Sequence, residues 1–293
     1  MSATIKDVAE LAKVSTATVS HVINKTRFVS EDTAEKVWSA IKQLNYNTNS
    51  VAKSLRSKKT NTIGLLIPDI SNYFFSEIAE VLQNTLKQNN YRLILGNSNE
   101  DINDEKAQVE VFNHQCIDGL IMVTTANDVS YLKKAIGHRY PVVFIDRKPV
   151  NYEADSVLVQ NFEGTYDAIT RLIEKGHRRI GFISGLQRLS TSMERLDGYK
   201  QALRDHGIPI DETLICYGNS KFESGYDLTQ NLVETAMATA IFIGNNLMTV
   251  GTVDYLIKNG FVIPRDVAII GFDDYNWAKI SNPPLSVIKQ PTY

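Results

Sequence analysis

The pattern of apolar and polar positions changes character near residue 60. Before it, short stretches place apolar residues three and four positions apart, which is the spacing of one helix face. Beyond Thr62, near-continuous apolar runs such as "TIGLLI", "GLIMVT", "RIGFISG" and "VAIIGFD" alternate with amphipathic stretches such as "SEIAEVLQNTLKQNN". Apolar strands that alternate with helices are typical of parallel sheets covered on both faces. There are too many runs for one compact sheet, so we expect two doubly wound parallel-sheet subdomains of α/β class behind an all-α head.

These patterns divide the chain into three parts. The head covers residues 1–49, and a short basic segment over 50–60 connects it to a body over 61–293. Within the body we expect a subdomain N over about 61–160 and a subdomain C over about 161–290, each built around one sheet. The chain crosses between them near "LVQNFEG" and "SVIKQP".

The head reads as three short helices. Thr4 and Asp7 have the spacing of a capping box at the start of the first helix. Ser15 and Ser30 are the expected N-caps of the second and third helices. The first two helices are separated by a very short break, which predicts a helix-turn-helix whose second helix can lie in a major groove of DNA.

The second helix, "VSTATVSHVIN", is dense in short hydroxyl side chains. Such donors can reach phosphates and base edges without holding the backbone away from DNA. His21 and Ala17 can read a base edge or a thymine methyl group. A small structural three-helix domain with a polar surface is the alternative. The hydroxyl residues are Ser15, Thr16, Thr18 and Ser20.

Charge and composition narrow the possible partners. The net charge of -2 hides an asymmetry, since residues 1–60 hold ten Lys and Arg against five Asp and Glu. A basic head on an acidic body indicates a polyanionic partner for the head, although chance clustering also gives such a difference. No apolar run approaches the roughly 18 residues of a membrane span, and no signal peptide is visible. We therefore expect a cytoplasmic protein with no membrane contact.

Two cysteines and the strand ends give the remaining chemistry. Cys116 and Cys216 are isolated, so we expect reduced thiols and no metal site. In open α/β sheets, ligands lie beyond the carboxyl ends of strands, and here these positions carry carboxylates, amides, guanidinium groups and aromatic rings. This combination is typical of a site for a small sugar. Taken singly, each residue could instead be a helix cap or a member of a surface ion pair.

Longer motifs carry a resemblance to a known family. "ATIKDVAELAKVSTATVSHVIN" and "VSEDTAEKVWSAIKQLNYNTNSVAKSLRS" closely resemble the lactose/galactose repressor family of bacterial transcription regulators. The resemblance covers the whole chain and is strongest to ribose-type members. It implies a homodimeric repressor whose operator is a palindrome with a central CG step.

The resemblance also implies roles for residues of the head and the connecting segment. Bases would face Thr16, Ala17 and His21. Phosphates would lie near Ser15, Thr18, Ser20 and Asn24, and the outer end of the half-site near Arg27. In the family, residues 50–60 form a hinge helix that pairs with its dimer mate and wedges a leucine into the minor groove. The matching residues are Val51 and Ala52 on the pairing face, Leu55 as the wedge and Arg56 beside it.

The body resembles periplasmic sugar-binding proteins. The ligand positions of the ribose-binding members fall on Asn72, Phe74, Phe75, Asp146, Arg147, Arg195, Phe222, Asn245, Asp273 and Gln290. Purine repressors instead carry a Trp after the matching Asp, so Arg147 argues against a purine.

Two departures from the family pattern stand out. A family segment "N-D-x-M-A" reads "NNLM" here, so Asn246 stands where an Asp is usual, and we expect it to cap a helix as the Asp does. Family members also continue for several tens of residues beyond the final "KQPTY". We therefore expect the chain to be a truncated piece.

These observations favour a repressor of a sugar-utilisation operon. A small sugar, with ribose as the first candidate, would release the repressor from its operator. We expect no cofactor. An enzyme is disfavoured because the strand ends offer no paired nucleophile and base and no phosphate loop. The main alternative is a catabolite-control-type regulator, whose DNA binding is promoted by a phosphorylated carrier protein and whose body also begins "PDISN".

Overall fold

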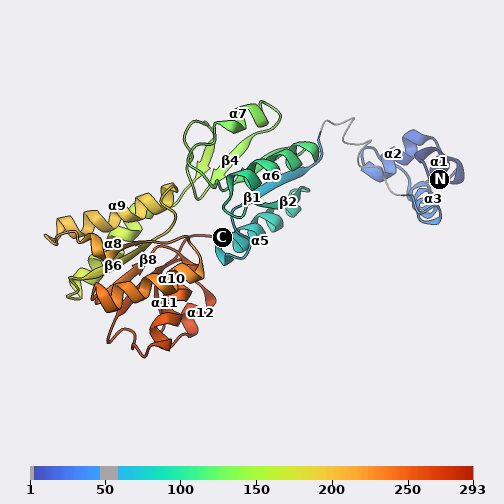
Figure 1. Ribbon diagram of the computed structural model, residues 1–293. Helices are drawn as coiled ribbons and strands as arrows, with labels where there is room; N and C mark the ends of the chain where they lie inside the picture. Colours follow the sequence, from blue (N-terminus) through green and yellow to red (C-terminus); the bar gives the residue numbers. More distant parts are fainter. Residues whose placement is uncertain (1–2, 47–58, 293) are drawn as a thin grey trace. The chain divides into compact units, whose positions relative to one another are not determined.

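A computed structural model describes residues 3–46 and 59–292 of the chain (Figure 1). The chain divides into two compact units, residues 1–60 and 61–293. The first unit holds the helical head, and the second holds both sheets of the body.

The head has a small core shared by three helices. Val8, Val19 and Val37 are each fully buried, and one comes from each helix. The apolar spacing of the sequence thus predicted the face by which each helix packs. The helices are α1 (Ile5–Leu11), α2 (Thr16–Asn24) and α3 (Glu31–Gln43).

Local capping chemistry explains where two of these helices begin. Thr4 and Asp7 form the predicted capping box, with the Thr4 N–H donating to the Asp7 carboxylate at 2.7 Å. Ser15 caps α2 by accepting from the Thr18 N–H at 3.1 Å. Ser30 does precede α3, but its hydroxyl group lies 2.8 Å from the Thr33 hydroxyl instead of bonding a backbone N–H. The expected side-chain cap of α3 is therefore absent.

Subdomain N contains a five-stranded parallel sheet in the order β2-β1-β3-β4-β5. Phe112 packs on one face of this sheet, while Phe75 packs on the other with Leu65 and Ile67. The strands are β1 (Thr62–Ile67), β2 (Arg92–Asn97), β3 (Gly119–Met122), β4 (Val142–Ile145) and β5 (Asp155–Val157). The helices are α5 (Tyr73–Gln88), α6 (Ile102–His114) and α7 (Tyr131–Ala135).

Subdomain C repeats this architecture with the order β10-β9-β8-β6-β7, again all parallel. The strands are β6 (Ile180–Ser184), β7 (Ile215–Tyr217), β8 (Ala240–Ile243), β9 (Ala268–Phe272) and β10 (Ser286–Ile288). The helices are α8 (Asn161–Glu174), α9 (Ser190–Asp205), α10 (Phe222–Gln230), α11 (Asn246–Lys258) and α12 (Asn276–Ile280). A 3₁₀ turn (Glu212–Leu214) precedes β7, and a π-helical turn (Asn231–Thr235) continues α10.

Helices cover both faces of the second sheet, as the apolar strands predicted. Figure 1 shows α8 and α9 on one side of this sheet and α10 and α11 on the other. Neighbouring strand residues alternate between the two cores, since Phe182 and Phe242 stack on the α8/α9 side while Ile183 and Ile243 pack on the α10/α11 side.

Helices α10 and α11 approach each other backbone to backbone. A Cβ atom on Gly251 would lie only 2.1 Å from the Phe222 carbonyl oxygen, and one on Gly225 only 2.2 Å from that of Met248. Side chains larger than hydrogen are therefore excluded at both contacts. This close packing holds the two helix N-termini side by side at the edge of subdomain C that faces subdomain N.

Candidate functional site

Helix α2 presents several of the residues predicted to contact DNA at the surface of the head. Thr16, Ala17 and Asn24 are exposed, whereas Val19 and Val22 are buried against the rest of the head. Arg27, just beyond the helix, is also exposed. The polar and apolar faces of α2 therefore lie as a recognition helix requires.

Two of the predicted DNA-contacting side chains are held at the end of α2. Nδ1 of His21 lies 2.8 Å from the Thr26 hydroxyl, and the Asn24 amide donates to the Ser20 carbonyl oxygen at 2.9 Å. Among the described residues His21 makes no other hydrogen bond, so its Nε2 has no partner there. The predicted hinge residues Val51, Ala52, Leu55 and Arg56 lie outside the described residues.

A cavity lies between subdomains N and C at the carboxyl ends of their strands. Its lining includes every predicted ligand residue except Phe222. These residues come from strand ends and helix starts far apart in the sequence, namely Asn72, Phe74, Phe75, Asp146, Arg147, Arg195, Asn245, Asp273 and Gln290.

Phe222 does not line the cavity. It is the first residue of α10, and its ring stacks on Tyr226 one turn later, with ring centroids 6.4 Å apart. Its place in the cavity wall is taken by the preceding residue, Lys221. Sequence reasoning also missed Glu100, which follows β2 at a strand end that was not considered. The other lining residues missed are Asp69, Leu189, Thr191, Ser192, Ser220 and Gly244.

Arg147 is the centre of a buried charge network at the end of β4. Its guanidinium group donates to both carboxylate oxygens of Glu100, at 2.7 and 3.0 Å, and to the Thr124 carbonyl oxygen at 2.7 Å. Its Nε lies 3.6 Å from the Asp146 carboxylate, too far for a hydrogen bond. Burial raises the pKa of Asp146, while Arg147 opposes that rise. Oδ1 of Asp146 and Nε of Arg147 are therefore buried without a hydrogen-bond partner among the described residues.

A second network lies on the opposite wall. Arg195, in the second turn of α9, donates to the Gly244 carbonyl oxygen at 2.5 Å and covers the Phe272 ring at 3.5 Å. The Gln290 amide donates to Asp273 at 2.5 Å. Burial raises the pKa of Asp273 to about 6, although Arg195 and Gln290 favour its charged form.

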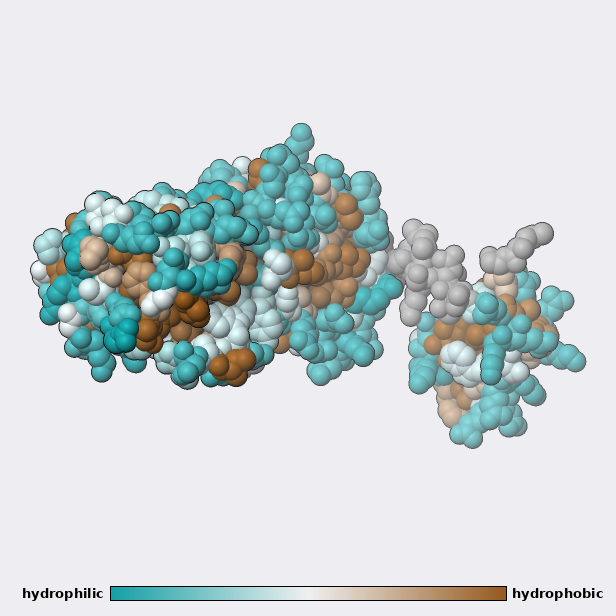
Figure 2. Space-filling model, turned by 60° about the horizontal axis from the view of Figure 1, so that its bottom comes forward, coloured by the Kyte–Doolittle hydropathy of each residue, from teal (hydrophilic) through white to brown (hydrophobic). Residues whose placement is uncertain are grey.

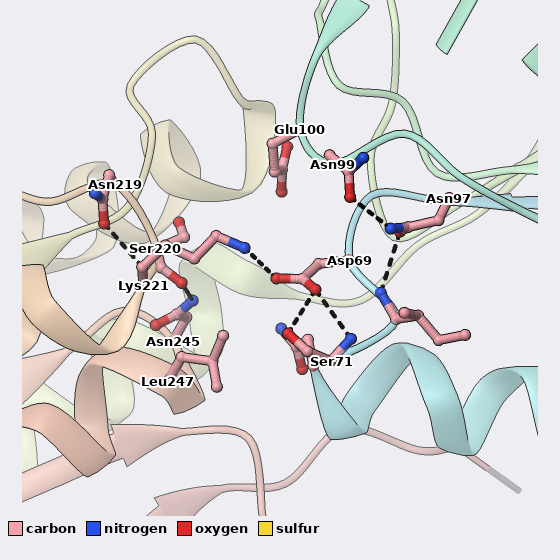
Figure 3. Close-up of polar contacts among 12 residues, drawn as sticks. Asp69, Ser71, Asn97, Asn99, Glu100, Asn219, Ser220, Lys221, Asn245 and Leu247 are labelled. Atoms are coloured by element: carbon pink, nitrogen blue, oxygen red, sulfur yellow. Dashed lines mark hydrogen bonds and ion pairs between the residues drawn. The ribbon is translucent and has the colours of Figure 1, made fainter. Parts of the chain in front are cut away.

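Several polar contacts join the described residues of the two subdomains, among them the Lys148 N–H that donates to the Ser190 hydroxyl at 3.3 Å and the three that follow. Figure 3 shows Lys221 reaching from the start of α10 to the Asp69 carboxylate, which also accepts from the Ser71 N–H at 2.9 Å. Arg188 donates to the backbone carbonyl oxygens of Thr125 and Glu100, at 3.0 and 2.9 Å. The third contact joins Asn246 to Asn72.

Asn246 does not play the capping role predicted for it. The N-cap of α11 is Asn245, whose side chain accepts from the Met248 N–H at 2.9 Å. Asn246 is the first helical residue and is fully buried. Its Nδ2 donates across the cavity to Oδ1 of Asn72 at 2.6 Å. The cap lies one residue earlier because Asn245 has the extended backbone of an N-cap, with φ -157° and ψ 171°, whereas Asn246 is already part of the helix.

Residues 4–49 match the family described as "Bacterial regulatory proteins, lacI family", and residues 60–292 match "Periplasmic binding proteins and sugar binding domain of LacI family". A Klebsiella pneumoniae protein named "HTH-type transcriptional repressor PurR" is 38% identical over 292 residues, covering 99% of this chain and 86% of that protein. The chain belongs to the LacI family of bacterial regulatory proteins.

Solved structures of other LacI-family proteins have the same architecture. A Lac repressor bound to ONPG in the repressed state superposes with a TM-score of 0.88 at 26% identity, covering 100% of this chain and 89% of that one. A putative ribose operon repressor from Burkholderia thailandensis gives a TM-score of 0.73 at 32% identity, covering 79% and 87%. The predicted fold class is confirmed.

Membership of the LacI family decides the general function. This chain is a DNA-binding transcriptional repressor with an effector-binding body, and it is not an enzyme. Among the described helices, none is both long and apolar enough to cross a membrane.

Proposed function

We propose that this LacI-family repressor is controlled by a small neutral sugar that binds in the cavity between subdomains N and C, with ribose as the first candidate. Sugar binding lowers the affinity for the operator of a sugar-utilisation operon. The observation that carries the proposal is a set of three buried polar atoms in the cavity wall.

These atoms are Oδ1 of Asp146, Nε of Arg147 and Oε1 of Gln290. Each belongs to a predicted ligand residue, and none has a hydrogen-bond partner among the described residues. Buried polar groups are nearly always hydrogen-bonded in native proteins, so a ligand is the natural partner for all three. Two of the atoms accept and one donates. Sugar hydroxyl groups both donate and accept, so one polyhydroxy ligand satisfies the set.

The charges of the cavity disfavour a phosphorylated effector. Among the described residues of the lining, four are carboxylates and three are cations, and Arg147, Arg195 and Lys221 already face acidic or carbonyl oxygens. A phosphate dianion would meet uncompensated negative charge in a buried site. A neutral ligand avoids this cost.

The choice of ribose rests on resemblance and on the cavity. Phe74 and Phe75 supply apolar faces for C–H groups, and the Arg147 guanidinium lies 5.9 Å from the centre of the Phe75 ring. The 32% identity to a putative ribose operon repressor supports this choice. The Klebsiella pneumoniae relative is named PurR, so a purine is the principal competing ligand.

The proposal includes the DNA side of the regulator. Thr16, Ala17 and His21 read bases of a palindromic operator with a central CG step, while Arg27 lies near its outer end. Leu55 provides the minor-groove wedge, flanked by Arg56, and the residues that contact phosphates are Ser15, Thr18, Ser20 and Asn24. A cytoplasmic location follows from this DNA partner.

A homodimer completes the proposal, because a palindromic operator matches a protein with two-fold symmetry. Large apolar side chains are exposed on subdomain N, among them Ile70, Tyr73 and Leu95. Figure 2 shows brown apolar areas among the teal hydrophilic surface of the body. Exposed apolar patches commonly mark contact surfaces between proteins. Effector and operator binding would then be linked reciprocally through the dimer, typically by about 1–3 kcal/mol.

Calorimetry and thermal shift with a ligand panel test the effector. The panel contains ribose, other pentoses, hexoses, ribose 5-phosphate and hypoxanthine. Ribose is expected to bind and to raise the Tm, while ribose 5-phosphate binds at least about tenfold more weakly because of the cavity's carboxylates. Binding of hypoxanthine without any sugar would overturn the proposal. So would a response only to a phosphorylated carrier protein, as the catabolite-control alternative requires.

A further inference from the structure

We propose that Asn246 is a positioning residue of the effector site, and that it fixes the Asn72 amide so that Asn72 offers a hydrogen-bond donor to the effector. The inference rests on the proposed function of the cavity. It assigns a role to a residue whose identity departs from the pattern described above and which does not itself line the cavity.

The contact between the two residues is short, buried and long-range. Asn246 is 0% exposed and Asn72 is 7% exposed, and their amides are joined at 2.6 Å although they lie 174 positions apart. Asn72 is the N-cap of α5 in subdomain N, and Asn246 begins α11 in subdomain C. The hydrogen bond therefore joins the starts of two helices on opposite sides of the cavity.

The backbone N–H of Phe74 determines which amide atom donates and which accepts in this contact. The Phe74 N–H can only donate, and it donates to a side-chain oxygen of Asn72 at 3.1 Å. That atom must be Oδ1, because an amide nitrogen cannot accept. The Asn246 atom facing Oδ1 must then be a donor, which makes it Nδ2. Its own Oδ1 accepts from the Leu247 N–H at 2.6 Å, which is consistent with this assignment.

One hydrogen-bonding group of the Asn72 side chain is therefore left for the effector. Both hydrogen bonds to the Asn72 side chain end on Oδ1, and its Nδ2 donates to no described residue. Because Asn72 lines the cavity, this NH₂ group is the part of its side chain left for a ligand oxygen. Asn246 thereby determines which end of the Asn72 amide the effector meets.

A carboxylate at position 246 would reverse this arrangement. Asp cannot donate to Oδ1 of Asn72, so it would either face that oxygen without a hydrogen bond or capture the Asn72 NH₂ group. The first outcome removes the second anchor of Asn72, and the second removes the donor from the effector. In the first case the donor of Asn72 is held less firmly, and in the second the ligand loses a hydrogen bond, while side-chain volume stays nearly the same.

Two substitutions at one position separate positioning from packing. Asn246→Asp conserves shape and reverses polarity, whereas Asn246→Ala removes volume without adding an acceptor. We expect N246D to weaken ribose binding about tenfold and N246A about threefold, as measured by calorimetry. A packing role predicts the opposite order, since the truncation leaves a cavity. The matched control is N259D, which adds the same charge at the exposed other end of α11 and should change ribose affinity less than about twofold.

A cycle with Asn72 tests whether Asn246 acts through it. In an Asn72→Ala background, adding N246D should cause no further loss of ribose affinity. Fully additive losses, or a larger loss for N246A than for N246D, would overturn the inference. If the wild-type chain binds no member of the ligand panel, the proposed function fails but the positioning role remains testable. Unfolding midpoints of N72A, N246A and the double variant should then be non-additive, and additive midpoints would contradict it.

Discussion

Helix α2 of the head and the cavity of the body both gather polar side chains, but they hold them differently. Thr16 and Ala17 are exposed, with neighbours that are largely their own helix. Arg147 and Asp273 are more than nine-tenths buried and are bound into networks with other charged and amide groups. The α2 residues are exposed to solvent until a partner binds, whereas the cavity residues are already buried in the folded protein.

This difference predicts whether a substitution should change binding alone or binding and folding stability together. At an exposed surface, a side chain contributes to binding with little effect on folding, and its charge is screened by salt. In the cavity, each charge depends on its partner, so removing one group changes stability, ionisation and ligand binding together. The predictions below test this contrast in order of expected effect.

Removal of Arg147 should give the largest effect. Arg147→Ala leaves Glu100 and Asp146 buried without their nearest cation, and breaking such pairs typically costs about 3–5 kcal/mol of folding free energy. Ribose affinity should fall at least about 100-fold, since the Nε donor proposed for the sugar is gone and the neighbouring Asp146 loses its cation. Calorimetry and chemical denaturation measure the two quantities. The exposed Arg204→Ala is the control, and wild-type ribose affinity in R147A would refute the site assignment.

His21→Ala should act on DNA selectivity and not on the body. A lost base contact changes discrimination at one operator position by about 1–3 kcal/mol. The unfolding midpoint of the body and its ribose affinity should stay unchanged. A sequence-selection assay measures the preference, and an unaltered operator motif would exclude His21 from the base-reading set.

Lys221 combines features of both regions, because its side chain is partly exposed and yet forms an ion pair with Asp69 across the cavity. It is the N-cap of α10 yet makes no side-chain cap, and a cation is unfavourable at a helix N-terminus. Lys221→Ser should therefore stabilise the body by up to about 1 kcal/mol. Loss of the cross-cavity pair with Asp69 should meanwhile weaken ribose binding by a few-fold.

The matched control for this prediction is Lys200→Ser. Lys200 pairs with Glu212 at 3.3 Å within subdomain C, so its loss leaves the cavity contacts intact. Ribose affinity should be unchanged in K200S. If K221S and K200S bind ribose equally well, the pair between Lys221 and Asp69 has no part in closing the cavity.

Asp273 should give a smaller, pH-dependent effect. Its pKa in the folded protein is raised to about 6, so the buried carboxyl group favours the folded state most at low pH. That contribution is lost as pH rises from about 4 to about 6, because the unfolded chain ionises first. Asp273→Asn should remove this loss. Its stability relative to wild type should thus increase over that range, and a constant difference in unfolding midpoint would contradict the assignment.

Much of the fold could be predicted because the signals are local. The capping box of Thr4 and Asp7, the cap at Ser15 and the apolar runs of the strands each lie within a few residues of the element they define. The strand-end rule then placed Asp146, Arg147 and Asp273 at one cavity.

The contacts across the cavity could not be predicted in this way. Asn246 with Asn72 and Lys221 with Asp69 are joined over 174 and 152 positions, and no spacing rule connects them. Phe222 shows a second limit, because it lies at the start of α10 beyond β7 while its ring stacks on Tyr226 of its own helix. Placement follows from topology, but side-chain direction follows from packing.

Operator affinity measured by fluorescence anisotropy, with and without saturating ribose, tests the central claim most directly. Ribose is expected to weaken binding of the wild-type protein to its palindromic operator by about 5–150-fold, the usual range of allosteric coupling. The R147A variant should bind the operator equally well with and without ribose. Operator affinity that ribose leaves unchanged in the wild type, or that only hypoxanthine or a carrier protein alters, would contradict the account.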